Sequence, residues 1–474
     1  MIAGLKPYAE TKDSDVAWLG DVPAHWETRK LRTVLRSETS RNQPNLPLLS
    51  VVRAKGVVLR DVSSKEENHN FIPDDLTNYK VVHRGQFVMN KMKAWQGSYG
   101  VSNYDGIVSP AYFTFDLLGV DGEFFHSAIR SQTYVSFFAQ ASDGVRIGQW
   151  DLSQSRMKEI PFVVPPPDEQ AAIVRFLDHA DRRIRRAIAV KQKLIRLLEE
   201  QKQAIIHRAV TRGLDPDVRL KPSGVEWLGD VPEHWEVRRA KSICLDIVDC
   251  KNRTPVAVDG GSYFVVRTTC IRNGRFSLTG SYATDEENFD IWTARGAPKI
   301  GDVFFTREAP AGEACLVPDR TDLCMGQRMM YFRPDPELLV PEFLLLSIYG
   351  PLTRTYVELA TNGSTVGHLR LGQVYGLPIL WCPVDEQRAI VRYVREETQE
   401  IERTQANTER EVALLREYRT RLIADVVTGK LDVREAAAQL PEAAGPGIPD
   451  DEAPDAEGDD EMSPDEAQAE DETA

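Results

Sequence analysis

Two long stretches of the chain carry apolar side chains at alternating spacings of three and four residues. In residues 168–212 the two interleaved sets are Leu177, Ile184, Lys191, Leu198 and Ile205, and Asp181, Ile188, Ile195, Lys202 and Ala209. In residues 385–432 they are Val394, Ile401, Thr408, Leu415 and Leu422, and Thr398, Gln405, Val412, Arg419 and Val426. Such a spacing is typical of coiled-coil helices, in which polar seam positions fix register and partner. We therefore predict two long helices that pair with each other.

Connectivity indicates how these helices should run. The first must lead into the second half of the chain and the second must lead back, so we expect an antiparallel pair. At 1.5 Å per residue the first helix should measure about 65 Å. Asp168, which follows Pro167, and Asp385 are candidate N-caps. The expected arrangement is two globules at opposite ends of a helical rod, related by a pseudo-two-fold axis.

Outside the long helices the pattern changes to short runs. Runs typical of strands lie at 86–89, 111–115, 263–267 and 329–332, and helical patterns at 124–140 and 341–359. We predict a fold of class α+β with one globule in each half. The expected limits are 1–167 and 213–384 for the globules, 168–212 and 385–432 for the helices, and 441–474 for a C-terminal tail.

The chain is internally repeated. Residues 18–27 read W-L-G-D-V-P-A-H-W-E and residues 227–236 read W-L-G-D-V-P-E-H-W-E. A P-x-x-D-E-Q junction at 165–170 returns as P-V-D-E-Q at 383–387, and V-T-R-G-L-D at 210–215 returns as V-T-G-K-L-D at 427–432. The regions between are much less alike. One fold with two divergent surfaces fits this pattern, and we expect Trp18, Trp26, Trp227 and Trp235 to be core anchors.

Charge is unevenly distributed along the 474 residues. The net charge is −14, but 14 Asp and Glu and no Lys or Arg lie in 441–474, which leaves 58 acidic against 58 basic residues in the remainder. We expect the acidic tail to be disordered, and a neutral body can bind nucleic acid if its basic groups gather on one face. We found neither a secretory signal nor a membrane-spanning stretch, and the six cysteines lack zinc spacing, so we expect a cytoplasmic chain with buried thiols.

The sequence lacks the motifs of an enzyme. There is no phosphate-binding G-x-x-x-x-G-K-[ST] loop and no N-P-P-[YF] methyltransferase motif. The repeated D-E-Q beside each helix start favours capping and helix-dipole roles over a catalytic carboxylate pair. We therefore expect no catalytic residue, metal site or bound cofactor in this chain.

Basic, amide and aromatic side chains in turns of the globules are the candidates for DNA contact, because they suit phosphates and base edges. In the first globule they are Arg53, Asn90, Lys91, Lys93, Trp95, Gln96, Ser98 and Tyr99. In the second they are Arg267, Arg272, Arg275, Arg307, Gln327 and Arg328. Any one of them alone could equally be a solvated surface group. The first helix has 11 basic against 6 acidic residues, which suits an outer face, an acidic partner or, as the sharper alternative, phosphate.

The two W-L-G-D-V-P-x-H-W segments, the D-E-Q junctions and the V-T ends resemble the specificity subunit of type I restriction-modification enzymes, over about residues 5–432. The resemblance implies two target recognition domains, each reading half of a split double-stranded DNA site. It implies that the helices set the gap and dock two methyltransferase subunits, which use S-adenosylmethionine to methylate adenine. Motor-nuclease subunits, with ATP and Mg²⁺, would complete the complex.

Two other functions stay open from the sequence. The chain could be a structural adaptor whose globules bind proteins across a coiled-coil spacer, without DNA specificity. It could also be a self-sufficient nuclease or methyltransferase whose motifs are unfamiliar. Salt-dependent DNA binding separates the first alternative, and turnover by the isolated chain with DNA, S-adenosylmethionine and Mg²⁺ separates the second.

Overall fold

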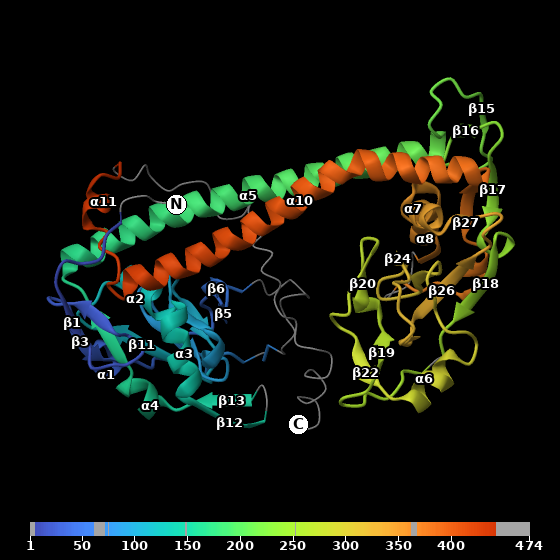
Figure 1. The fold of residues 1–474 in the computed structure, drawn as a ribbon. Helices are drawn as coiled ribbons and strands as arrows, with labels where there is room; N and C mark the ends of the chain where they lie inside the picture. Colours follow the sequence, from blue (N-terminus) through green and yellow to red (C-terminus); the bar gives the residue numbers. More distant parts are fainter. Residues whose placement is uncertain are drawn as a thin grey trace. The chain divides into compact units, whose positions relative to one another are not determined.

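The computed structural model describes residues 5–60, 72–73, 75–146, 149–251, 253–361 and 367–441. These residues form two compact units: the first holds those up to Gln192 and from Glu409 onward, and the second holds those from Lys193 to Thr408. The long helices α5 (Pro167–Arg212) and α10 (Val384–Val427) contribute to both units (Figure 1). The predicted acidic tail, from 442 onward, lies outside the described residues.

The first unit is built around a four-stranded antiparallel sheet. Its strands, in spatial order, are β4 (Leu35–Ser37), β11 (Tyr112–Leu117), β8 (Phe87–Asn90) and β9 (Tyr99–Val101). Two further antiparallel pairs are β5 (Leu49–Val52) with β6 (Gly56–Leu59), and β7 (Lys80–Val82) with β10 (Gly106–Val108). Helices α2 (Gly122–Ile129) and α3 (Gln132–Gln140) follow the sheet.

The second unit repeats this sheet with the same connectivity. The corresponding strands are β18 (Cys244–Asp249), β26 (Met329–Pro334), β23 (Val303–Thr306) and β24 (Ala314–Leu316). A second sheet has β22 (Tyr282–Thr284), β19 (Tyr263–Val266) and β25 (Leu323–Met325), and β20 (Ile271–Arg272) pairs with β21 (Arg275–Phe276). Helices α7 (Pro341–Tyr349) and α8 (Pro351–Thr361) follow. The sequence repeat is therefore also a repeat of topology, and the fold is mixed helix and strand as predicted.

Each W-L-G-D-V-P segment forms the second strand of a short hairpin. The hairpins are β1 (Thr11–Asp13) with β2 (Asp21–Pro23), and β15 (Leu220–Pro222) with β16 (Asp230–Pro232). In each half, the region between the W-L-G-D-V-P segment and the D-E-Q junction is called the variable region. Its first strand pairs antiparallel with its last strand. These pairs are β3 (Glu27–Lys30) with β14 (Pro161–Val164), and β17 (Glu236–Arg239) with β27 (Pro378–Trp381). Each variable region therefore begins and ends at one place.

Shorter elements complete the chain. They are α1 (Leu31–Val34), η1 (Ala94–Gln96), β12 (Ser142–Arg146), β13 (Gln149–Leu152), α4 (Gln154–Glu159), η2 (Ala240–Ser242), η3 (Thr268–Cys270), α6 (Glu286–Thr293), α9 (Leu371–Tyr375) and α11 (Arg434–Ala438).

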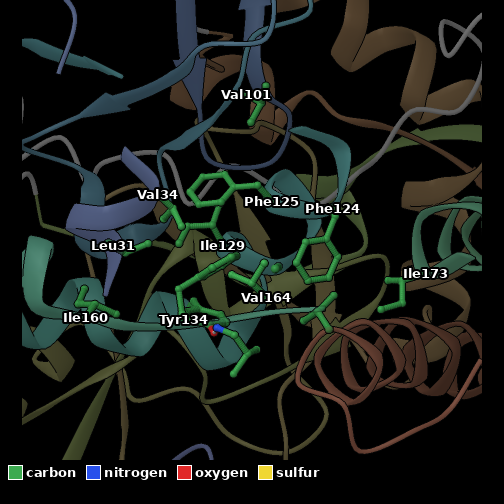
Figure 2. Packing of buried hydrophobic residues seen from close by; sticks show 14 of the residues in the cluster. Leu31, Val34, Val101, Phe124, Phe125, Ile129, Tyr134, Ile160, Val164 and Ile173 are labelled. Atoms are coloured by element: carbon green, nitrogen blue, oxygen red, sulfur yellow. The ribbon is translucent and has the colours of Figure 1, made fainter. Parts of the chain in front are cut away.

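An aromatic cluster centred on Phe162 of β14 forms the core of the first unit. The rings of Phe124, Phe125 and Tyr134 have centroids 6.2, 5.0 and 5.3 Å from that of Phe162. Figure 2 shows Phe124, Phe125 and Tyr134 among the buried residues of this core. Because these rings are offset or tilted, they gain quadrupole attraction in addition to burial. The cluster fixes both helices against the strand that precedes α5.

The four tryptophans of the repeated segments do not share one environment. Trp26 and Trp235 are fully buried, and Trp18 is half-buried and stacks on Phe137 at 3.6 Å, so these three are core residues as predicted. The prediction is wrong for Trp227, whose exposed fraction is 44%. At the α8 position corresponding to Phe137, Tyr356 instead donates its hydroxyl to the carbonyl of Gln373.

The long helices pair antiparallel within each unit. In the first unit Arg419 donates to Asp181, and Lys191 Nζ lies 2.5 Å from Glu411 Oε2. In the second unit Lys202 Nζ lies 2.5 Å from Glu402 Oε1, and Gln405 bonds Glu199 at 3.4 Å. Rising numbers on α5 thus meet falling numbers on α10. Each predicted seam position is buried or half-buried, and charged seam positions are paired across the helices.

The long helices begin earlier than predicted. α5 begins at Pro167 and α10 at Val384, because the first helical hydrogen bonds run from Gln170 to Pro166 and from Gln387 to Pro383. In α5 the first helical residue is Pro167, and proline fits this position since its missing N–H would have no partner there. The N-cap prediction for Asp168 and Asp385 is therefore wrong. Both aspartates lie in the first turn, where the helix dipole favours negative charge.

Candidate nucleic-acid interface

The glutamate of each D-E-Q motif is bonded to the histidine or tryptophan of the H-W pair that precedes it. In the first unit His25 Nε2 lies 2.7 Å from Glu169 Oε2, and the Tyr8 hydroxyl donates to Glu169 Oε1. In the second, His234 Nε2 lies 2.8 Å from Glu386 Oε2, and Trp235 Nε1 donates to Oε1 at 3.0 Å. These contacts, called here the latch, join the W-L-G-D-V-P-x-H-W segment to the start of the long helix. They give the two repeated motifs a common structural role.

The glutamine of each motif extends this latch to the variable region. Gln170 accepts a hydrogen bond from the N–H of Asp121, the N-cap of α2, at 2.7 Å. Gln387 likewise accepts from the N–H of Val340, the N-cap of α7, at 2.8 Å. Each amide also donates at 2.7 Å to the carbonyl of the residue just after the preceding strand, Pro165 after β14 and Cys382 after β27. Both glutamines are buried, so the motif positions helices.

Most of the DNA-contact candidates of the first unit lie at one end of its sheet. β8 ends at Asn90, which is opposite Tyr112 at the start of β11. Lys91, Lys93, Trp95 and Gln96 follow in the turn that includes η1. Lys93 is exposed and Trp95 and Gln96 are half-buried. This turn therefore presents a lysine and side chains suited to base or phosphate contact.

Two residues of this turn already have defined partners. Lys91 Nζ lies 3.0 Å from Asp151 Oδ2, and Asn90 donates to the Tyr112 hydroxyl at 3.3 Å while accepting from the Met92 N–H at 3.1 Å. DNA contact by either residue would need these bonds to be shared or exchanged.

The structure corrects the prediction for Tyr99 and Ser98. Tyr99 begins β9, is fully buried, and donates its hydroxyl to the Ile129 carbonyl at 3.2 Å. Its ring packs 4.5 Å from that of Phe138. Ser98 is also buried. Because α2 and α3 cover this strand, neither side chain is available to DNA in this conformation.

Arg53 lies in the turn between β5 and β6 and is exposed, as is Lys55, which the sequence reasoning missed. Arg130 anchors this turn by donating to the carbonyls of Arg53 at 2.8 Å and Ala54 at 2.9 Å. The same guanidinium donates to the Tyr99 carbonyl at 2.7 Å. A half-buried guanidinium thus fixes an exposed basic turn.

In the second unit, Arg272 and Arg275 face each other across the β20–β21 hairpin and are exposed. The turn residues Asn273 and Gly274 have φ of 48° and 79°, the left-handed pair that a type I′ turn requires. Like charges directly opposite each other on a hairpin are destabilising, so this pair suits an anionic ligand. Arg267, at the end of β19, is exposed as well.

Arg307, Gln327 and Arg328 lie at one end of the four-stranded sheet of the second unit, where β23 ends and β26 begins. Arg307 is 11% exposed and its Nη1 lies 3.1 and 3.2 Å from the two carboxylate oxygens of Asp249, so the prediction that it contacts DNA is corrected. This mostly shielded arginine instead pairs with Asp249 and connects the turn after β23 to β18. Gln327 and Arg328 are exposed, although Arg328 Nε also lies 3.2 Å from Glu308 Oε1.

The described residues include no group of His, Cys, Asp or Glu arranged to hold a metal ion. No helix among them is long and apolar enough to cross a membrane. The six cysteines are free thiols, and burial raises the pKa of Cys315 to about 12, so this thiol stays protonated at neutral pH. Five of the thiols are buried as small apolar groups, as predicted, and Cys244 is half-buried.

Comparison with known proteins gives matches along most of the chain. A solved chain from work on complex assembly and conformational transition of the type I R-M system has a TM-score of 0.58 at 16% identity, over 86% of this chain and 99% of that one. The chain therefore has the fold of a type I R-M component. No family model matches.

Curated relatives indicate which component. The putative type I restriction enzyme MjaX specificity subunit of Methanocaldococcus jannaschii is 18% identical over 411 residues, covering 80% of this chain and 88% of the relative. The type I restriction enzyme EcoBI specificity subunit of Escherichia coli is 20% identical over 256 residues, or 52% and 53% of the two chains. The chain thus resembles type I restriction enzyme specificity subunits in sequence.

Proposed function

We propose that this chain is the DNA-reading specificity subunit of a type I restriction-modification complex and that each unit reads one half of an asymmetric, bipartite site. The observation that carries this proposal is a repeated scaffold with divergent loops. The histidine–glutamate contact of the latch and the connectivity of the four-stranded sheet are the same in both units, whereas the exposed basic groups differ. A repeated frame with two different surfaces suits two different base sequences, because groove edges are read by side-chain identity.

The candidates that remain are those with exposed or half-buried side chains. In the first unit they are Arg53, Asn90, Lys91, Lys93, Trp95 and Gln96. In the second they are Arg267, Arg272, Arg275, Gln327 and Arg328. Phosphate contacts by the cations would set the position of each unit on the duplex, and amide or guanidinium contacts with base edges would set the sequence.

In this proposal α5 and α10 form a coiled-coil spacer that relates two target recognition domains by a pseudo-two-fold axis. A helix of 46 residues measures about 70 Å, enough to serve half-sites about 34 Å or one helical turn apart. Seam charges paired across the helices fit a fixed register. Heptad-length insertions between Val210 and Lys221 should then alter the gap between half-sites and not the bases read.

We propose further that the chain supplies recognition and no catalysis. Two methyltransferase subunits would dock on it, and motor-nuclease subunits would join the complex. S-adenosylmethionine, ATP and Mg²⁺ would belong to those partners. The carboxylates of the D-E-Q motifs support this division, because Glu169 and Glu386 are occupied by structural hydrogen bonds within the chain.

Salt-dependent binding of a defined duplex tests the proposal. The chain, assembled with its methyltransferase partners, should bind double-stranded DNA with an affinity that falls steeply between about 50 and 200 mM salt. A structural adaptor would show no such binding. Turnover of DNA by the isolated chain with S-adenosylmethionine and Mg²⁺ would contradict the non-catalytic role.

A further inference from the structure

In each unit, a side chain at the end of a helix forms hydrogen bonds with the backbone of a basic turn. The two residues, Arg130 after α2 and Tyr349 at the end of α7, occupy equivalent positions. Glu123 and Phe124 near the start of α2 correspond to Glu342 and Phe343 in α7. Counting along both helices places Arg130 and Tyr349 at equivalent positions. Their side chains differ completely in chemistry, yet each bonds the backbone of an exposed turn that carries two cationic side chains.

In the second unit the fastening is made by a phenol and a carboxylate. The Tyr349 hydroxyl accepts from the Gly274 N–H at 2.8 Å, and Glu313 Oε2 accepts from the Asn273 N–H at 2.7 Å. The two groups also bond each other at 2.9 Å. Both amides of the type I′ turn are therefore held from the interior, which leaves Arg272 and Arg275 pointing from a fixed backbone.

The carboxylate is itself held in place. Glu313 is buried, and Arg354 of α8 lies 3.5 Å from its Oε1 while donating to the Gly312 carbonyl at 3.1 Å. The hydroxyl of Tyr349 also accepts from the Ala314 N–H at 3.1 Å. This network ties the hairpin to β24 and α8.

In the first unit the bonds run in the opposite sense. Arg130 donates to carbonyls of the β5–β6 turn, where Tyr349 and Glu313 accept from amides. His126, one helical turn earlier on α2, contributes to the same support, since a Cβ on Gly56 would lie 3.2 Å from its Cε1 and 3.1 Å from Arg130 Nη1. The exposed side chains of this turn are Arg53 and Lys55.

We infer that Arg130 and Tyr349 are positioning residues that hold two basic turns, residues 53–55 and 272–275, in the geometry that contacts the phosphate backbone of DNA. The inference rests on the proposed function, and it adds which loops touch the duplex and what fixes them. Arg53, Lys55, Arg272 and Arg275 form no side-chain ion pair with any residue that the structure describes, so their charge is available to phosphate. Preorganisation lowers the entropy lost on binding, which is the gain such a network gives.

The test uses the complete complex and its cognate duplex, with variants of the second unit. Tyr349→Phe removes one hydroxyl and leaves the ring. Tyr356→Phe in α8 is the matched control, because its hydroxyl donates to the Gln373 carbonyl away from the hairpin. Tyr349→Phe should weaken DNA binding about fivefold to tenfold, about the net contribution of a single hydrogen bond, and should speed hydrogen exchange at Asn273 and Gly274. Tyr356→Phe should change neither.

Salt dependence separates phosphate contact from a purely structural effect. Arg272→Ala and Arg275→Ala should each lower the slope of log K against log salt by about 0.9, as expected for one lost phosphate contact. In the first unit Arg130→Lys should act as Tyr349→Phe does, while Arg36→Lys, at an exposed ion pair with Asp116, should not.

Each result decides a definite point. The inference is overturned if Tyr349→Phe behaves like its control, or if the two alanine variants leave the slope unchanged while the wild-type complex binds its site. If the wild-type complex shows no salt-dependent, site-specific binding at all, the proposed function itself fails.

Discussion

His25 and Glu169 lie 2.7 Å apart, between Nε2 and Oε2, and this contact joins two motifs separated by 144 residues. The same pair of motifs meets in the second unit through His234 and Glu386. The first latch has an additional element: Arg434 follows α10, lies 4.0 Å from Glu169 and bonds Asp432 at 2.6 Å. The first latch thus ties segments near both ends of the chain to α5.

Substitution of the two glutamates should have unequal effects. Glu169 is 3% exposed and Glu386 is 27% exposed. Glu169→Gln should reduce the stability of the first unit by about 1–3 kcal/mol, because it removes a buried charge that accepts hydrogen bonds from two side chains. Glu386→Gln should reduce the stability of the second unit by less. Hydrogen exchange resolved by unit measures both. An equal or larger loss for Glu386→Gln would show that burial does not set the strength of the latch.

Acid should destabilise the first unit through His126. Burial first, and the neighbouring Arg130 second, lower the pKa of this imidazole to about 4. The unfolded chain takes up the proton near pH 6.5, whereas the folded chain resists until about pH 4, so stability falls as pH decreases through that window. The loss is about 3 kcal/mol at most.

The pH effect is measured as the difference between wild type and His126→Gln in denaturant unfolding at pH 7 and pH 4.5. The second unit has Leu345 at the equivalent position and serves as an internal control. The same pH dependence in the variant would show that other groups cause it.

Charge reversal should reveal the pairing of the long helices. Lys202→Glu places an acid beside Glu402 and near Glu199, and should destabilise the pair. Adding Glu402→Lys should restore much of the loss, with a coupling of about 0.5–1 kcal/mol. The control is Arg421 with Glu417, an exposed pair within α10, for which a smaller coupling is expected. Thermal unfolding of single and double variants gives both couplings, and equal values would argue against a specific cross-helix pair.

The two outer tryptophans should respond differently to truncation. Trp18→Ala removes a ring stacked on Phe137 and should cost about 2–4 kcal/mol. Trp227→Ala removes a side chain that is nearly half exposed and should cost less than about 1 kcal/mol in the isolated chain. Denaturant unfolding compares them, and a larger loss for Trp227→Ala would contradict the packing described.

Sequence reasoning could predict what depends on periodicity and repetition. The seam residues from Leu177 to Val426 are all shielded, and the antiparallel direction agrees with connectivity. The repeated motifs mark a repeated topology. These features are recoverable because spacing alone determines which helix face is apolar and which segments share a fold.

The support of the candidate interface could not be read from the sequence. Tyr99 is of a residue type that often contacts nucleic acid, but it is buried. Arg307 forms an ion pair with Asp249. Arg130 and Tyr349 look like ordinary helix-end residues until the fold brings the turns against them. Long-range contacts decide burial and pairing, and no local pattern encodes them.

Selection of bound sites from a pool of randomised duplexes, with the assembled complex, tests the central claim most directly. We predict two specified blocks of bases separated by an unspecified gap, and replacement of residues 27–160 by another first variable region should rewrite one block and leave the other and the gap unchanged. A single continuous block, or a change in both blocks after the replacement, would contradict the account.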